Sequence, residues 1–109
     1  MTRGDQLRGI NRERQVAAQM AESGWWVMRA AGSKGVADLV CLHQGRTPMM
    51  LEIKSTTAGP FSGFGPAERE ALLDAAALAG ASCFLVWWPR HGKAEWFGVD
   101  QWPPDRRAT

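Results

Sequence analysis

Four charged residues occupy positions that would otherwise belong to a hydrophobic core: Glu13, Asp38, Glu52 and Lys54. Glu13 falls on the apolar side of a predicted helix. Asp38 directly precedes an apolar run, and Glu52 and Lys54 alternate with apolar residues along a predicted strand. A buried carboxylate is costly unless it is paired with a cation or binds a metal. These four side chains are therefore the first candidates for chemistry.

Asp38 and Glu52 would stand opposite each other if the two segments that carry them form a hairpin centred on Gly45. Their Cβ atoms would then lie roughly 5 Å apart, and like charges so placed repel. Something positive should lie between them. Lys54 is one candidate, and Mg²⁺ is the better one, because two carboxylates and a backbone carbonyl suit a hard cation.

A divalent cation held in this way can polarise a phosphoryl oxygen and acidify a bound water. Lys54 beside it could orient that water or stabilise charge on the phosphorus. The residues together favour phosphodiester hydrolysis. Simpler interpretations stay open for each residue alone. Glu13 could pair with a nearby arginine at a less inward position, and Glu52 and Lys54 could form an ion pair on a polar outer face.

The elements that must position these residues follow from apolar periodicity and turn signals. A helix is expected over 9–23, with Ile10, Val16, Ala17, Met20 and Ala21 on its inward side and Gly24 at its end. Strands are expected over 25–30, 37–43, 48–54, 82–88 and 94–99. A second helix is expected from Pro66 to Ala79, between a loop over 55–65 and Gly80. This order predicts an α/β fold with a mixed sheet and helices on its faces.

The chain has 109 residues, of which 45% are hydrophobic and 22% charged, so it is not a disordered tail. We expect one nuclease domain over 1–109, with its core at about 9–100 and a short irregular tail over 101–109. No apolar run approaches the roughly 20 residues that a membrane span needs, and no membrane partner is expected. Cys41 and Cys83 are expected to be free, buried thiols in a reducing compartment, which indicates the cytoplasm, or the host cytoplasm if a phage encodes the protein.

The positive charge is concentrated in the first half of the chain. Residues 1–54 carry eight basic and five acidic side chains, whereas residues 55–109 carry five basic and six acidic ones. Ten of the thirteen cations are arginine, the side chain that matches phosphate geometry best. This distribution is compatible with a nucleic-acid backbone as partner, although charge alone says little about function.

Asp38 followed by Glu52-Ile53-Lys54 resembles the motif of the PD-(D/E)XK nuclease superfamily, with Ala37 in place of its proline. The wider context over residues 9–54 is similar to the archaeal-type Holliday junction resolvases, the Hjc family. The segments that carry this likeness are Arg12-Glu13-Arg14, Gly24-Trp25, 27–34, 38–40 and 51–54. The resemblance implies a restriction-endonuclease-like αβββαβ core.

The resemblance also implies roles for individual residues. Glu13, Asp38, Glu52 and the backbone carbonyl of Ile53 would bind Mg²⁺, for which Mn²⁺ would substitute. Lys54 would be the catalytic lysine, and Ser33 would lie on a loop that reaches the active site. Contacts to DNA phosphates would come from Arg12, Arg14, Arg29 and Lys34. The protein would act as a homodimer that resolves four-way DNA junctions by paired symmetric nicks, because both the dimer and the junction have two-fold symmetry.

Two other functions remain compatible with the sequence. Another PD-(D/E)XK nuclease would act on flaps, mismatches or specific duplex sites, since fold resemblance does not fix the substrate. A DNA-binding protein that has lost cleavage would need no carboxylate pair, so the full set of charged residues argues against it.

Overall fold

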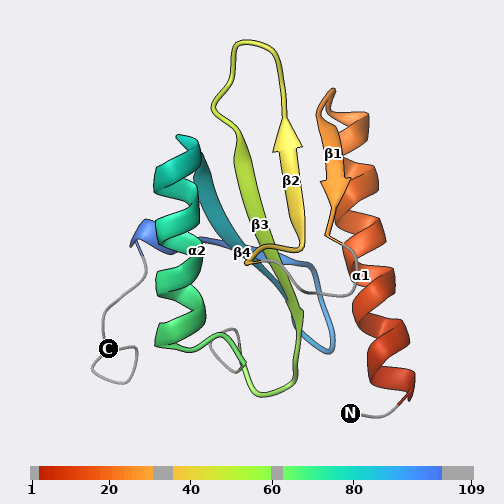
Figure 1. The fold of residues 1–109 in the computed structure, drawn as a ribbon. Coiled ribbons are helices and arrows are strands. Elements are labelled where there is room, and N and C mark those ends of the chain that lie inside the picture. Colours follow the sequence, from red (N-terminus) through yellow and green to blue (C-terminus); the bar gives the residue numbers. More distant parts are fainter. Residues whose placement is uncertain (1–2, 31–35, 60–62, 102–109) are drawn as a thin grey trace.

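The computed structural model describes residues 3–30, 36–59 and 63–101, which form helices packed on both faces of a five-stranded sheet (Figure 1). The elements in chain order are α1 (Arg3–Glu22), β1 (Trp26–Arg29), β2 (Leu39–Leu42), β3 (Met49–Ser55), α2 (Pro66–Ala79), β4 (Ser82–Trp88), β5 (Glu95–Gly98) and a 3₁₀ turn, η2 (Val99–Gln101). The predicted α/β class and the order of elements are confirmed.

The strands lie in the order β1-β2-β3-β4-β5, so the sheet follows the order of the sequence. All neighbours are antiparallel except β3 and β4, which are parallel. A parallel pair needs a long crossover, and α2 supplies it. As a result, the carboxyl ends of β3 and β4 lie at the same edge of the sheet, at the lower end in Figure 1.

The two helices cover opposite faces of the sheet. Val16 and Met20 of α1 pack against a buried cluster that includes Leu51 and Ile53 of β3. Leu72 of α2 belongs to a second cluster on the other face. Side chains alternate along a strand, so β3 directs its even-numbered residues toward the side of α2. The sequence pattern of β3 therefore decides which face carries its charges.

Helix α1 differs from the prediction in its start and in its inward face. It begins at Arg3 rather than at residue 9. Val16 and Met20 are buried as predicted, whereas Ile10 and Ala21 are exposed. Successive residues turn by about 100° around a helix. The sheet covers a stripe centred between Val16 and Met20, and Ile10 and Ala21 lie about a quarter-turn outside it.

The second half of the chain follows its sequence signals closely. Helix α2 spans Pro66–Ala79 and β4 spans Ser82–Trp88, both as predicted. Pro66 opens the helix, and the Glu68 carboxylate accepts a hydrogen bond from the Gly65 N–H at 2.7 Å. Gly80 ends it in the left-handed region, with φ of 65°.

The other strands are shorter or shifted by one or two residues relative to the prediction. β1 leaves out residues 25 and 30, β3 is displaced by one residue to 49–55, and β5 covers 95–98. β2 begins at Leu39 instead of residue 37, for a reason that lies in the Asp38 side chain and is described below. Cys41 and Cys83 are free and buried, as expected. Neither helix in the described residues has the length and apolar character needed to cross a membrane.

Candidate active site

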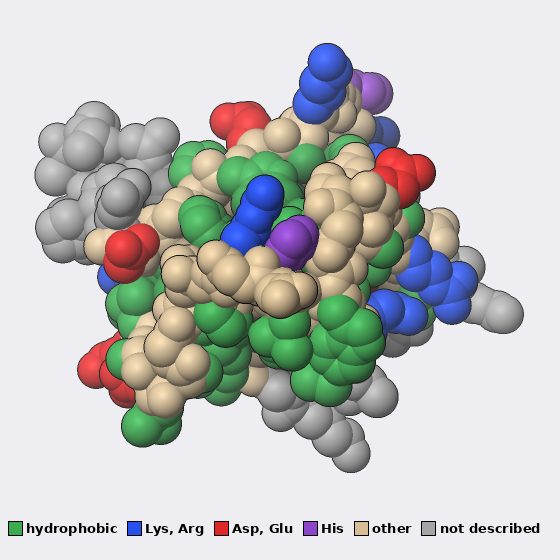
Figure 2. Space-filling model, turned by 90° about the horizontal axis from the view of Figure 1, so that it is seen from above, with side chains coloured by type: hydrophobic (Ala, Val, Ile, Leu, Met, Phe, Trp, Pro, Cys, Tyr) green, Lys and Arg blue, Asp and Glu red, His purple; other side chains and the backbone are tan. Residues whose placement is uncertain are grey.

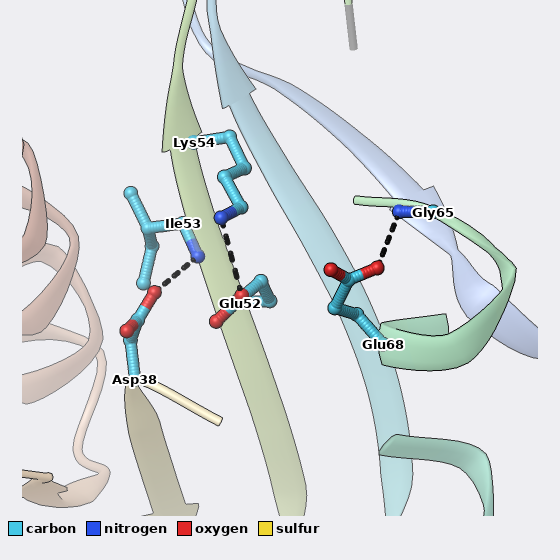
Figure 3. A network of polar contacts seen from close by, with 6 residues as sticks. All are labelled: Asp38, Glu52, Ile53, Lys54, Gly65 and Glu68. Atoms are coloured by element: carbon cyan, nitrogen blue, oxygen red, sulfur yellow. Dashed lines mark hydrogen bonds and ion pairs between the residues drawn. The ribbon is translucent and has the colours of Figure 1, made fainter. Parts of the chain in front are cut away.

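Asp38 and Glu52 come together because β2 and β3 pair in the predicted register. Leu39 lies opposite Leu51 and Val40 lies opposite Met50, which is the arrangement expected from a turn centred on Gly45. One step further along each strand, the register places Asp38 beside Glu52. The hairpin therefore brings two carboxylates together at the start of β2, next to the second half of β3 (Figure 3).

The Asp38 side chain accepts a hydrogen bond from β3 that a backbone carbonyl would accept in a regular sheet. Its Oδ2 accepts a hydrogen bond from the Ile53 backbone N–H at 2.8 Å, and its own backbone N–H donates to the Leu51 carbonyl at 2.8 Å (Figure 3). The ladder between the two strands stops at Leu39 for this reason, and β2 is shorter than predicted. Asp38 is 9% exposed, so its carboxylate is held in a fixed place by the backbone of β3.

Glu52 lies in an environment that opposes its ionisation. Burial, with a hydrogen bond to the neighbouring Asp38 carboxylate and repulsion by its charge, raises the pKa of Glu52 to about 8. Lys54 acts in the opposite direction, with its Nζ 3.6 Å from a Glu52 carboxylate oxygen. The two side chains leave one face of β3 side by side (Figure 3). One lysine does not neutralise the two carboxylates.

Glu13 approaches the same place from the other face of the sheet. Its side chain is 16% exposed and its Oε1 lies 3.7 Å from the Arg29 guanidinium. Burial raises the Glu13 pKa, Asp38 raises it further, and Arg29 lowers it. The sequence left open whether Glu13 points inward or pairs with an arginine. In the structure Glu13 does both. Asp38 is the carboxylate whose charge reaches both glutamates.

The donor set fits a divalent cation in part. Within residues 3–30, 36–59 and 63–101, no three acidic, histidine or cysteine side chains gather closely enough to hold an ion. Asp38 and Glu52 form the close pair, and Glu13 remains with Arg29. The Asp38 and Glu52 carboxylates repel each other when both are ionised. A hard cation bound between them would offset this repulsion, so the pair suits a divalent metal ion.

A family model described as archaeal Holliday junction resolvase (Hjc) matches residues 5–106. The chain belongs to this family. Among solved structures, the fold is similar to Hjc from Archaeoglobus fulgidus, a Holliday junction resolvase from an archaeal hyperthermophile. That match has a TM-score of 0.70 at 25% sequence identity and covers 85% of this chain and 74% of the other. No curated protein matches the sequence.

Membership in the Hjc family confirms the resemblance noted in the sequence. The protein is a nuclease of the Holliday junction resolvase type, its substrate class is the DNA junction, and the family implies dependence on a divalent metal. The resemblance inferred from residues 9–54 extends over nearly the whole chain, including the second helix and the last strands. The carboxylates and the lysine therefore lie within a nuclease fold.

Three of the remaining predicted site residues of this Hjc-family protein are arginines in the described part of the chain. Arg14 is exposed on α1, and Arg29 is partly exposed beside Glu13. The Arg12 guanidinium lies 4.4 Å from the centre of the Trp88 ring. Ser33 and Lys34 lie outside the described residues. The DNA-contact roles of Arg12, Arg14, Arg29 and Lys34 stay predictions, as does the place of Ser33 at the active site.

One positioning residue near the site was not singled out in the sequence. The Trp87 Nε1 donates to the Thr56 carbonyl at 3.1 Å and lies 3.2 Å from the Thr56 hydroxyl. Trp87 pairs with Lys54 across β3 and β4. It therefore ties the segment that follows Lys54 to the neighbouring strand. The signal was indirect, because tryptophans in a small domain usually belong to the core or an interface.

Proposed function

We propose that this Hjc-family protein resolves four-way DNA junctions with Mg²⁺ by paired symmetric nicks. The observation that carries the proposal is the placement of Asp38, Glu52 and Lys54 at one end of the sheet, where two neighbouring, largely buried carboxylates lie beside a lysine that pairs with Glu52. A structural ion pair would not need the second carboxylate.

Asp38, Glu52 and the carbonyl of Ile53 would hold the cation, with Glu13 as a further ligand from the other face of the sheet. A bound divalent cation would polarise the phosphoryl oxygen and acidify a water, and Mn²⁺, which also accepts oxygen ligands, would substitute for Mg²⁺. Asp38 is oriented for this role by the Ile53 N–H. Lys54, 3.6 Å from Glu52, would orient the attacking water or stabilise charge on the phosphorus.

Paired nicks need two active sites, so the proposal includes a homodimer. The end of the molecule opposite the carboxylates carries exposed apolar side chains, and Figure 2 views this end, where hydrophobic side chains cover much of the surface. Trp26 is 59% exposed, Leu42 is 41% exposed, and Leu78 of the alanine-rich helix α2 is 92% exposed. Exposed apolar side chains of this size favour association. A second copy bound here would leave both carboxylate pairs free for DNA.

The experiment uses a plasmid that extrudes a cruciform, incubated with the protein and Mg²⁺. Two nicks made within one binding event give linear plasmid, whereas unpaired nicks give open circles. Labelled linear duplex, flap and single-stranded substrates serve as controls. We expect linear product from the cruciform alone, with symmetric cut positions. Equal cutting of duplex or flap would contradict the junction assignment, and open circles alone would contradict paired cleavage.

The dimer is tested separately by sedimentation of the free protein at micromolar concentration. Leu78→Asp should shift the protein toward monomer and replace linear plasmid by open circles, because the charge lies on the proposed contact. Glu70→Gln, an exposed change on the same helix, is the control. A monomeric wild type that still makes linear product would contradict the homodimer. A cytoplasmic location belongs to the same proposal and agrees with the two free cysteines.

A further inference from the structure

A cleft of about 400 Å³ opens at the end of the sheet where β3 and β4 terminate. Three separate segments line it: α1, the segment after β3, and the turn after β4. Its polar lining residues are Arg12, Ser55, Thr56, Thr57, Arg90 and His91. The lining contains two arginines and no carboxylate, so the cleft suits an anion.

The arginine on the helix side of the cleft is held in place. Arg12 lies over the Trp88 ring at 4.4 Å, and its Nη1 donates to the Gln15 side chain at 2.9 Å. A cation stacked on an aromatic ring loses less freedom when it binds a ligand. Arg90 on the opposite wall is exposed. Among the described residues neither arginine forms an ion pair, so both charges are available to a ligand.

The cleft adjoins the carboxylate pair along two elements. Ser55 follows Lys54 on β3, and Arg12 precedes Glu13 on α1. Neighbouring strand residues point to opposite faces of the sheet. Ser55, which lines the cleft, therefore points to the face opposite that of Lys54, and the two faces meet at this end of the sheet. A DNA strand that passes over Lys54 could continue into the cleft.

We infer that this cleft binds a backbone phosphate of the cut DNA strand, a few nucleotides from the scissile bond. The inference rests on the proposed function, because it assumes that DNA lies over Lys54. Arg12 and Arg90 supply planar donor pairs that match phosphate oxygens, and His91 with the nearby hydroxyls adds further donors. A fixed second phosphate would set the direction in which the strand crosses the active site. Such a contact positions DNA without reading its sequence.

The first test is the salt dependence of junction binding, measured without metal so that no cutting occurs. Removal of one phosphate contact lowers the slope of log K against log [salt] by about 1. We expect this change for Arg90→Gln, with a similar loss of affinity for junction and duplex. Arg46→Gln is the matched control, because it removes the same charge from an exposed turn at the other end of β3. Equal slopes for Arg90→Gln and the wild type would overturn the inference.

The second test replaces single phosphates of the cut strand by neutral methylphosphonates. Replacement at a single position, a few nucleotides from the scissile bond, should weaken wild-type binding by about tenfold or more, as expected for a hydrogen bond to a charged group. The same replacement should have no further effect on Arg90→Gln. Independent effects at every position would overturn the inference.

Inorganic phosphate is the probe for a different ligand. If it quenches the tryptophan fluorescence of the wild type but not of Arg90→Gln, while no methylphosphonate position depends on Arg90, the cleft binds a small anion and the inference is wrong. Failure of junction cutting would overturn the proposed function and would leave the slope measurement intact. Normal paired nicking with an unchanged slope would overturn this inference alone.

Discussion

The first half of β3, from Met49 to Leu51, packs as an ordinary strand, whereas the second half, from Glu52 to Ser55, places two charges on one face. Leu51 is fully buried against the core under α1. Glu52, one residue later, is also shielded from water, yet it faces a carboxylate and a lysine instead of apolar groups. The same strand therefore provides stability at one end and a reactive site at the other.

The difference shows how a small fold can carry a costly site. Burial of ionisable groups lowers stability unless each charge is matched. The cost is tolerated because the first half of β3 and its neighbours supply a continuous core on both faces of the sheet. The following changes test whether the two halves are separable in this way.

Asp38→Asn should have the largest effect, and on the second half alone. The asparagine oxygen can still accept the Ile53 N–H, so the hairpin should keep its structure, but one metal-binding charge is lost. We expect single-turnover nicking of a four-way junction to fall by at least about a thousandfold, because a bound metal contributes several kcal/mol. Binding to the junction should change little.

Asp74→Asn is the control for that variant. Asp74 is exposed on α2, and its substitution removes the same charge. It should cut at the wild-type rate. Cutting by Asp38→Asn within tenfold of the wild type would show that the second half of β3 does not carry the chemistry.

Leu51→Ala should have the next largest effect, and on the first half alone. Truncation of a fully buried leucine costs about 2–5 kcal/mol of unfolding free energy. Urea denaturation measures this loss, and Ile10→Ala, a partly exposed site on α1, should cost less than half as much. Nicking per folded molecule should stay near the wild-type rate. A large loss of nicking in fully folded Leu51→Ala would show that the two halves are coupled.

The most gradual expected effect is the pH dependence of stability without metal, since it is spread over several pH units. The pKa of Glu52 is raised from 4.5 to about 8 in the folded protein, so between these values the folded state binds more protons than the unfolded one. The contribution of Glu52 to stability should therefore be fully present below about pH 4.5 and should be lost as pH rises toward 8, by about 1 kcal/mol per pH unit. The raised Glu13 pKa acts in the same direction.

Urea denaturation in the presence of a chelator, repeated over this pH range, measures the effect. Glu52→Gln should flatten the profile, because glutamine does not titrate. A wild-type profile that rises between pH 5 and 8 would contradict the buried carboxylate pair.

The sequence predicted the fold well where local signals were strong. Pro66 and Gly80 correctly predicted the first residue of α2 and the residue that ends it. The turn at Gly45 correctly predicted that Leu39 pairs with Leu51. The start of α1 was missed because its first turns carry polar residues with no apolar periodicity. Local patterns fix caps and turns, whereas the extent of an amphipathic helix depends on what packs against it.

The carboxylate pair was also predictable, because one register places Asp38 beside Glu52. Two features were not. The Asp38 carboxylate accepts the Ile53 N–H, so β2 begins two residues later than predicted, and no sequence pattern reports such a side-chain bond. The cleft around Arg12 and Arg90 depends on the parallel pairing of β3 with β4, since only that topology brings their ends to the same edge. The general rule that ligands bind near the carboxyl ends of parallel strands could have indicated it.

The central claim is that Asp38 and Glu52 form a metal site that lowers stability when it is empty of cation. The most direct measurement is the melting temperature of the wild type and of Glu52→Gln at pH 8, with a chelator and then with Mg²⁺, because an ion that binds the folded state raises its stability. We predict that Glu52→Gln melts above the wild type without metal and that Mg²⁺ raises only the wild type. An equal rise with Mg²⁺ in both proteins, or a lower melting temperature of Glu52→Gln without metal, would contradict the account.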